Sequence, residues 1–187
     1  SAVKIQTYTP DTMTIDKSDG DFLIKDGLWK GRNLYELYEE AHTPWEWFEE
    51  LFQHAEKCGI TIFSSPFDKK AVDLLEGLGC PAYKIASFEI LDHELIEYAA
   101  SKMKPIILST GMANKEEISE AIEVVRRTKN NDLIILHCVS GYPSTPDDYN
   151  LKTIVEMQNY FGVDVGLSDH TISNNAAIAS VALDVCF

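Results

Sequence analysis

Lysine, hydroxyl and histidine side chains recur along this chain, each time at the end of a short apolar run. They are Lys4 and Gln6, Ser65, Lys84 and Ser87, Ser109, Ser140 and Tyr142, and Ser168 and His170. Ammonium groups, hydroxyls and backbone amides after a strand bind small molecules with several negative charges, and the Ser-Thr-Gly turn at 109–111 suits phosphate oxygens. The pattern therefore favours a site for a phosphate together with a carboxylate.

Lys4 and Lys84 each interrupt an apolar run, where a buried ammonium group is costly unless a negative group compensates it. One explanation is an internal ion pair, with Glu89 as the available acceptor near Lys84. The other is an anionic ligand. Two such lysines close to several serines shift the balance towards the ligand.

His170 ends the phrase Ser-Asp-His at 168–170. A divalent metal ligand or an acid–base role is one interpretation, and a packed histidine is the other. One histidine is not a metal site, so a partner must come from elsewhere in the protein. His137 is one candidate partner, although it could instead pack inside the fold.

Six short apolar runs predict buried parallel strands at 2–6, 60–63, 82–86, 105–108, 133–137 and 163–167. Start signals mark the helices between them: a capping box at 43–46, with Pro44 at the first helical position, and a second box at 114–117 with Asn114 as the cap. Gly59 suits the end of the first of these helices.

Strand, helix and strand in alternation predict right-handed crossovers, and hence a doubly wound sheet or a (β/α)8 TIM barrel. The absence of a G-x-G-x-x-G phrase weakens the dinucleotide-binding option. A barrel normally has eight strands, whose carboxyl ends meet at one catalytic mouth. Because the chain opens inside a strand and 182–187 reads as another strand beginning, we expect a single partial barrel domain over 1–187. It would lack the first strand and most of the last.

An unusually long connection separates Gln6 from the helix expected near Pro44. It contains the aromatic phrases GLWKG at 27–31 and YELY at 35–38. They predict either a lid or sugar-stacking wall at the mouth, or a short helix that buries its own aromatic side chains.

The composition excludes several classes of partner and site. With 16 Lys and Arg against 30 Asp and Glu, the net charge of -14 speaks against nucleic acid and against anionic membranes. No apolar stretch is long enough to span a membrane, and no signal peptide is evident. The four cysteines are scattered, which favours reduced thiols over a zinc cluster or a disulfide framework. We expect a soluble, cytoplasmic protein.

Five strand-end phrases together resemble the sialic acid synthase (NeuB-like) family: VKIQTY at 3–8, FSSPF at 63–67, AYKIAS at 82–87, ILSTGM at 107–112 and GLSDH at 166–170. The resemblance runs through essentially all 187 residues. The phrases TYTPDT at 7–12, GLW at 27–29, LYELY at 34–38 and TPWEW at 43–47 are most similar to the pseudaminic acid branch. The N-acetylneuraminate, legionaminate and spore-coat polysaccharide synthases are neighbouring branches.

The resemblance implies a transferase that depends on a divalent metal, Mn2+ or Mg2+. It would condense phosphoenolpyruvate with the open-chain aldehyde of an N-acetylated amino sugar. The products would be a nine-carbon 2-keto sugar acid and phosphate.

The resemblance also implies roles for single residues. Lys4, Ser65 and Lys84 would hold the phosphoenolpyruvate anion, with Lys84 also catalytic. The hydroxyls around its phosphate would be those of Ser87, Ser109, Ser140 and Ser168, although the neuraminate branch carries asparagine where Ser140 stands.

Gln6 and Tyr142 would face the amino sugar, and His170 would be a catalytic residue and one of two metal-binding histidines. The family's second histidine, its first-strand acidic residue and its C-terminal antifreeze-like domain fall outside this sequence. We therefore expect these 187 residues alone to be inactive, and the full-length protein to be a homodimer.

Two rival functions remain at this point. Lys84 could be the nucleophile of a Schiff-base aldolase acting on a keto acid. Alternatively, the chain could be an inactive module that binds a sugar or a phosphate.

Overall fold

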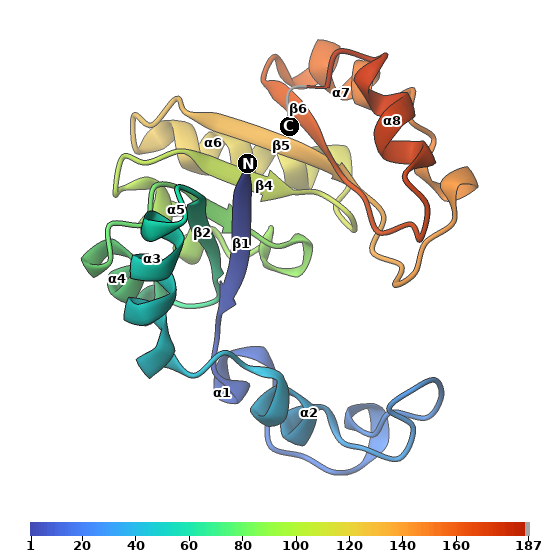
Figure 1. The fold of residues 1–187 in the computed structure, drawn as a ribbon. Coiled ribbons are helices and arrows are strands. Elements are labelled where there is room, and N and C mark those ends of the chain that lie inside the picture. Colours follow the sequence, from blue (N-terminus) through green and yellow to red (C-terminus); the bar gives the residue numbers. More distant parts are fainter. Residues whose placement is uncertain (186–187) are drawn as a thin grey trace. The chain divides into compact units, whose positions relative to one another are not determined.

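The computed structural model describes residues 1–185 and divides into two compact units, Ser1–Pro81 (unit 1) and the chain from Ala82 onwards (unit 2). In both units, strands alternate with helices along the chain (Figure 1). That the two units together form one catalytic domain stays a prediction.

Unit 1 is built on a parallel pair of strands, β1 (Ala2–Thr7) and β2 (Thr61–Pro66). Their register places Lys4 opposite Phe63 and Gln6 opposite Ser65. The other elements of unit 1 are α1 (Pro10–Met13), η1 (Gly20–Phe22), α2 (Leu34–Ala41), η2 (Trp45–Trp47), α3 (Phe48–Lys57) and α4 (Lys69–Gly77).

Unit 2 contains the parallel strands β3 (Tyr83–Ile85), β4 (Ile106–Ser109), β5 (Leu133–Cys138) and β6 (Asp164–Ser168). Each pairs with the next in sequence order. The helical elements are η3 (Ser87–Glu89), α5 (His93–Ala100), α6 (Lys115–Arg127), η4 (Pro146–Tyr149), α7 (Thr153–Phe161) and α8 (Asn175–Val181). All six predicted strands are confirmed, and the largest shift is at β2, which ends at Pro66 rather than Phe63.

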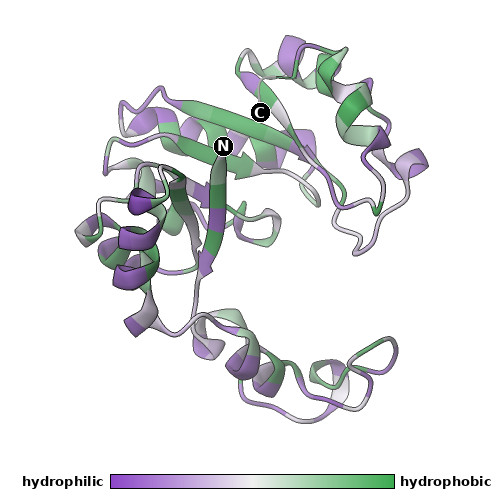
Figure 2. Cartoon of the chain, in the orientation of Figure 1, coloured by the Kyte–Doolittle hydropathy of each residue, from purple (hydrophilic) through white to green (hydrophobic). Residues whose placement is uncertain are grey.

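The strands of unit 2 supply much of its apolar core. Ile106, Leu108, Ile135 and Val165 are completely buried, and β4 and β5 are coloured as hydrophobic in Figure 2. Because successive side chains of a strand point to opposite faces, every second residue of these strands lies on the other face. That face carries the predicted site residues Lys84, Ser109 and Ser168.

The prediction that all six strands are buried is wrong for β1. Ala2, Val3, Lys4 and Gln6 are exposed, and only Thr7 is fully buried. Within the described chain, one edge of β1 pairs with β2. Water reaches most of the β1 side chains.

The predicted helix start at 43–46 is also wrong. Pro44 is extended (φ -55°, ψ 132°) and precedes the short 3-10 turn η2, while α3 begins at Phe48. The Trp47 amide donates to the Pro44 carbonyl, a bond typical of the tighter 3-10 turn.

The other two helix signals are confirmed. The Asn114 side chain accepts from the Glu117 amide, and the Glu117 carboxylate accepts from the Asn114 amide, as a capping box requires. Gly59 ends α3 at φ +64°, a left-handed conformation that glycine adopts without strain.

The strand expected to begin at 182 is not found over 182–185. Ala182–Asp184 instead form a turn at the end of α8, in which the Leu183 amide donates to the Ser180 carbonyl. Asp184 is left-handed (φ +57°), which interrupts an extended conformation. Cys186 and Phe187 lie outside the described residues.

The long connection after β1 combines both predicted alternatives. It contains the predicted short helix, α2, and the Tyr38 ring meets the buried Tyr8 ring edge-on at 5.9 Å. Leu28 and Trp29, in contrast, are 89% and 51% exposed between two left-handed glycines. The helical part packs, and the GLWKG part faces solvent.

Two predictions about the protein's class can be compared with the structure. Over residues 1–185, no helix has the length and apolar character needed to cross a membrane. Cys58 and Cys138 are free thiols, as expected, whereas Cys186 is not described.

Candidate functional site

Strand register places three predicted residues of unit 2, Lys84, Ser109 and Ser168, on one face. Lys84 lies opposite Ile107, Ser109 opposite Leu136, and Cys138 opposite Ser168. Because side chains two residues apart share a face, Lys84, Ser109, Cys138 and Ser168 all belong to the same side of these strands.

A close cluster surrounds Gly111, just after β4. A Cβ atom at this position would lie 2.5 Å from Ser140 Oγ, 3.0 Å from Ser87 Oγ and 3.1 Å from Cys138 Sγ. The Gly111 amide donates to Ser87 Oγ at 3.2 Å, and Ser87 Oγ lies 3.6 Å from Cys138 Sγ. The structure therefore brings Ser87 and Ser140 together at a point where only glycine leaves space.

Two hydroxyls of this region are buried without a partner. Ser109 Oγ and Ser140 Oγ have no hydrogen-bond partner among residues 1–185, and Ser109 is 0% exposed. The neighbouring hydroxyl of Thr110 donates to the Leu136 carbonyl at 2.9 Å. Buried hydroxyls normally have partners because leaving them unpaired costs free energy. Ser109 and Ser140 therefore have the donors that a bound anion could use.

Lys84 is half-buried on the same face. Burial lowers the pKa of Lys84, while the nearby Cys138 and Glu89 partly oppose this effect. Burial likewise raises the pKa of Glu89. Glu89 Oε2 has no hydrogen-bond partner in the described part of the chain. Lys84 and Glu89 therefore interact electrostatically. That Lys84 binds an anion stays a prediction.

His170 has a defined orientation. Its Nδ1 atom lies 2.8 Å from the Val139 carbonyl, which can only accept, so this nitrogen carries the proton. In the neutral ring, Nε2 then holds the lone pair and lies 3.4 Å from Ser168 Oγ. A hydrogen bond from the other ring nitrogen to a carbonyl is typical of metal-binding histidines.

His170 thus fits the role of one metal ligand. Among residues 1–185, no group of three or more His, Cys, Asp or Glu side chains is arranged to hold a metal ion. The role of His170 in metal binding stays a prediction.

Tyr142 lies against His170, with the two ring centroids 4.3 Å apart and the planes tilted by 38°. Tyr142 is 71% exposed. Partial burial is the main cause that raises the pKa of its phenol, and Cys138 and Tyr149 add to the effect. An exposed aromatic ring beside His170 is suited to contact a neutral sugar.

His137 does not join this group. It alternates with Leu136 and Cys138, so it lies on the opposite face of β5. Its Nε2 atom contacts the Tyr149 carbonyl, and the two rings meet edge-on at 6.1 Å. The structure favours the packed alternative for His137.

In unit 1, Lys4, Gln6 and Ser65 share one face of the β1–β2 pair. Lys4 and Gln6 are exposed, whereas Ser65 is 1% exposed and its Oγ has no partner in the described chain. Ser64 contacts Thr7 Oγ1 at 2.7 Å and donates to the Ile5 carbonyl. That these three residues and those of unit 2 share one cavity stays a prediction.

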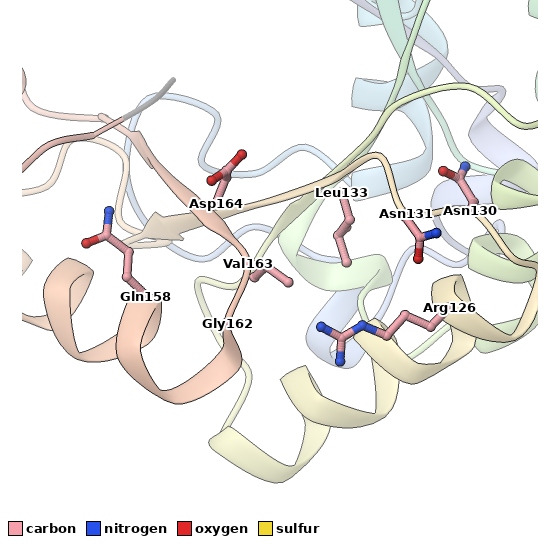
Figure 3. A pocket seen from close by; sticks show the side chains of 8 residues that line it. All are labelled: Arg126, Asn130, Asn131, Leu133, Gln158, Gly162, Val163 and Asp164. Carbon is pink, nitrogen blue, oxygen red and sulfur yellow. The ribbon is translucent and has the colours of Figure 1, made fainter.

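Cavities also lie among the described residues of unit 2. One of about 530 Å³ borders Thr110, Gly111, His137 and Cys138 and extends between α6 and α7, but Lys84, Ser109 and Ser140 do not line it. Another, of about 460 Å³, lies where β5 and β6 begin, between Arg126, Leu133 and Asp164 (Figure 3). The second cavity is therefore at the opposite strand ends from the predicted residues.

Two residues near this site were missed from the sequence, Cys138 and Tyr149. Alternation along β5 could have identified Cys138, because it lies two residues after Leu136 on the face that includes Lys84. Tyr149 is fully buried, and its hydroxyl contacts the backbone on both sides of Asp169. No local sequence signal marks that contact.

The sequence matches the NeuB family over residues 1–187. It is 52% identical to a pseudaminic acid synthase from Helicobacter pylori over 181 residues, which cover 97% of this chain and 53% of the relative. It is 43% identical to an N,N'-diacetyllegionaminic acid synthase from Campylobacter jejuni over 140 residues, or 74% of this chain and 42% of the relative. The chain thus spans about half the length of these relatives.

Among solved structures, an N-acetylneuraminic acid synthetase from Leptospira borgpetersenii, in complex with citrate, matches with a TM-score of 0.85 and 29% identity. The match covers 97% of this chain and 58% of that chain. This likeness confirms the predicted fold class, an α/β chain of TIM-barrel type that corresponds to part of the relative's fold.

Proposed function

Because the chain belongs to the NeuB family, we propose that the protein condenses phosphoenolpyruvate with the open-chain aldehyde of an N-acetylated amino sugar. The products are a nine-carbon 2-keto sugar acid and phosphate. The relatives that are about half identical to this chain are named pseudaminic acid synthases, which supports pseudaminic acid as the product. N-acetylneuraminate, legionaminate and spore-coat precursors are the alternatives.

One observation carries this proposal: the cluster of hydroxyls around Gly111. Ser87 and Ser140 converge there, and the buried Ser140 and Ser109 hydroxyls have no partner within residues 1–185. Lys84 belongs to the same strand face as Ser109. A phosphate oxygen accepts several such donors at once, and the lysine balances its charge.

In the proposed reaction, carbon 3 of phosphoenolpyruvate attacks the aldehyde carbon, which forms the new C–C bond. The aldehyde oxygen becomes a hydroxyl by taking up a proton. Water adds to the cationic carbon 2 and loses a proton. The tetrahedral intermediate then expels phosphate as its C–O bond breaks, and the C2 hydroxyl gives up its proton to leave the 2-keto group. Lys84 and the hydroxyls of Ser87, Ser109, Ser140 and Ser168 hold the phosphoenolpyruvate anion, while Gln6 and Tyr142 face the sugar. Fixing both reactants removes much of the entropic barrier.

His170 would hold a divalent metal (Mn2+ or Mg2+) through Nε2, since Nδ1 is bonded to the Val139 carbonyl. The metal would supply positive charge that stabilises the charge developing on the aldehyde oxygen. We also propose that Lys4 and Ser65 bind phosphoenolpyruvate. We also propose that the enzyme works in the cytoplasm as a homodimer. The free thiols Cys58 and Cys138 support a reducing compartment.

The test is a turnover assay of the complete protein with a panel of N-acetylated hexoses. We expect phosphate release only when phosphoenolpyruvate, one of these sugars and Mn2+ or Mg2+ are all present. Phosphate release without the sugar would contradict the proposal. Binding of phosphoenolpyruvate without turnover would instead favour an inactive binding module.

The lowered pKa of Lys84 favours a second candidate, a Schiff-base aldolase, because a neutral amine is the nucleophile in that chemistry. Borohydride with pyruvate would trap a covalent adduct on Lys84 if the protein is such an aldolase. The condensation proposal predicts that no adduct forms.

A further inference from the structure

Tyr149 connects the loop after β5 to the residues that end β6. It closes the short helix η4 and is 0% exposed. Its hydroxyl accepts from the His170 amide at 2.6 Å and donates to the Ser168 carbonyl at 3.0 Å. One side-chain group therefore bonds the backbone on both sides of Asp169.

Other contacts fix the same two segments together. The Ser144 amide donates to the His170 carbonyl at 3.1 Å, and Ser144 Oγ lies 3.4 Å from the Tyr149 hydroxyl. The backbone of His170 is thus held on its amide side by Tyr149 and on its carbonyl side by Ser144. The His170 ring is held separately, by Val139 and Tyr142.

The position of Tyr149 is itself set locally. The Thr145 hydroxyl and amide both donate to the Asp148 carboxylate, at 2.8 and 3.2 Å, at the start of η4. The Tyr149 ring then packs edge-on against His137 at 6.1 Å. The hydroxyl consequently reaches the β6 exit in one orientation.

We propose that Tyr149 is a positioning residue that sets where His170 Nε2 and Ser168 Oγ point. The inference rests on the proposed function for the identity of the ligand, but not for the geometry. A hydroxyl can accept from an amide and donate to a carbonyl at the same time, and a phenyl ring can do neither. Removing it takes the Tyr149 partner from two part-buried backbone groups, the Ser168 carbonyl and the His170 amide, which loosens the segment they belong to.

The variant Tyr149→Phe tests this in the complete protein, with two readouts that do not depend on turnover. Hydrogen exchange over 166–171 should speed up, because the His170 amide loses its acceptor. Calorimetric titration with Mn2+ alone should show an affinity lower by about tenfold, the low end for residues that orient a metal ligand. Excess Mn2+ should restore turnover.

Tyr160→Phe is the matched control, since it removes the same hydroxyl from a 59% exposed position on α7. It should change neither readout. If Tyr149→Phe fails to fold, Thr145→Ala replaces it, because this change loosens η4 but keeps the tyrosine. Thr145→Ala should speed the exchange of 166–171 and weaken Mn2+ binding, each to a smaller extent.

The outcomes separate the two claims. Unchanged exchange at 166–171 in Tyr149→Phe, or in Thr145→Ala where that variant replaces it, would overturn the positioning role. Faster exchange with unchanged Mn2+ affinity would overturn it as well, provided that His170→Ala weakens Mn2+ binding. If His170→Ala leaves Mn2+ affinity unchanged, the proposed metal role fails, and the exchange readout alone decides the role of Tyr149.

Discussion

The strand faces of unit 1 and unit 2 each carry a lysine, and each also carries a buried serine whose hydroxyl has no hydrogen-bond partner in the described chain. The two lysines differ in their exposure to water. Lys4 in β1 is exposed beside Gln6, whereas Lys84 in β3 is half-buried and its pKa is lowered by burial. Charges interact more strongly with a ligand where water is excluded. Unit 2 should therefore contribute more of the binding free energy for an anion than unit 1.

Replacing the two lysines in turn is the most direct test of this difference. Lys84→Met should weaken phosphoenolpyruvate binding by more than about 100-fold, since truncating one partner of a buried charge pair costs several kcal/mol. Lys4→Met should weaken it by no more than about fivefold, as for an exposed, screened pair. Titration calorimetry measures both affinities, and unfolding curves should show that both variants fold. Equal losses would contradict the comparison.

The glycine at the centre of the unit 2 cluster provides the next test. Gly111→Ala introduces a Cβ atom 2.5 Å from Ser140 Oγ, so the hydroxyls must move apart. We expect kcat/KM to fall by about 100-fold, the scale reported for misplacements near 1 Å. Gly141→Ala is the control, because its nearest neighbour would be Ser144 Cβ at an ordinary 3.6 Å. A similar loss in both variants would indicate a general disturbance of the loop.

Two serines separate binding from stability. Ser109→Ala removes a buried hydroxyl without a partner among residues 1–185, so phosphoenolpyruvate affinity should fall by about tenfold while stability stays the same or rises. Ser64→Ala removes hydrogen bonds to Thr7 and Ile5, so it should destabilise the protein by about 1–2 kcal/mol and leave binding unchanged. Denaturant unfolding measures the stability of both variants, and titration with phosphoenolpyruvate measures their affinities. Each variant should change only one of the two quantities for the worse.

The smallest effect is a pH dependence. The pKa of Lys84 lies below its ordinary 10.5, so Lys84 loses its proton earlier than an exposed lysine as pH rises. As the pH rises, phosphoenolpyruvate affinity should therefore begin to decline before pH 10.5 is reached. Lys84→Met should abolish this decline. The unfolded chain holds this proton more tightly, so the unliganded protein should gain stability as pH rises through the lowered pKa. A decline that persists in Lys84→Met would assign the step to another group.

The strands could be predicted from the sequence because each is a short apolar run between polar segments, as in β4 and β5. The exposure of β1 could not, because the same apolar pattern does not reveal how many neighbours a strand has. The helix start at 43–46 was also mispredicted, since Pro44 suits the first helical position but its backbone is extended. Local patterns predict an element better than its environment.

The candidate site shows the same limit. Lysines and serines at strand ends could be identified because their chemistry is unusual next to apolar residues. The difference between Ser64 and Ser65 depends on cross-strand partners, Thr7 and Ile5, that lie more than fifty residues away in sequence. The role of Tyr149 likewise depends on a contact that spans 21 residues.

Adjacent polar residues at the ends of β2 and β4 have a consequence for insertions and deletions. In each phrase, Ser64-Ser65 and Ser109-Thr110, one hydroxyl is bonded internally and its neighbour points to the other side. Losing a single residue upstream within either strand would swap the two orientations, so that a hydroxyl would still be present on each side. The residue types at these positions would be unchanged, but the neighbouring apolar side chains would point to the opposite face of the strand. Length changes inside β2 or β4 should therefore be tolerated less well than most substitutions there.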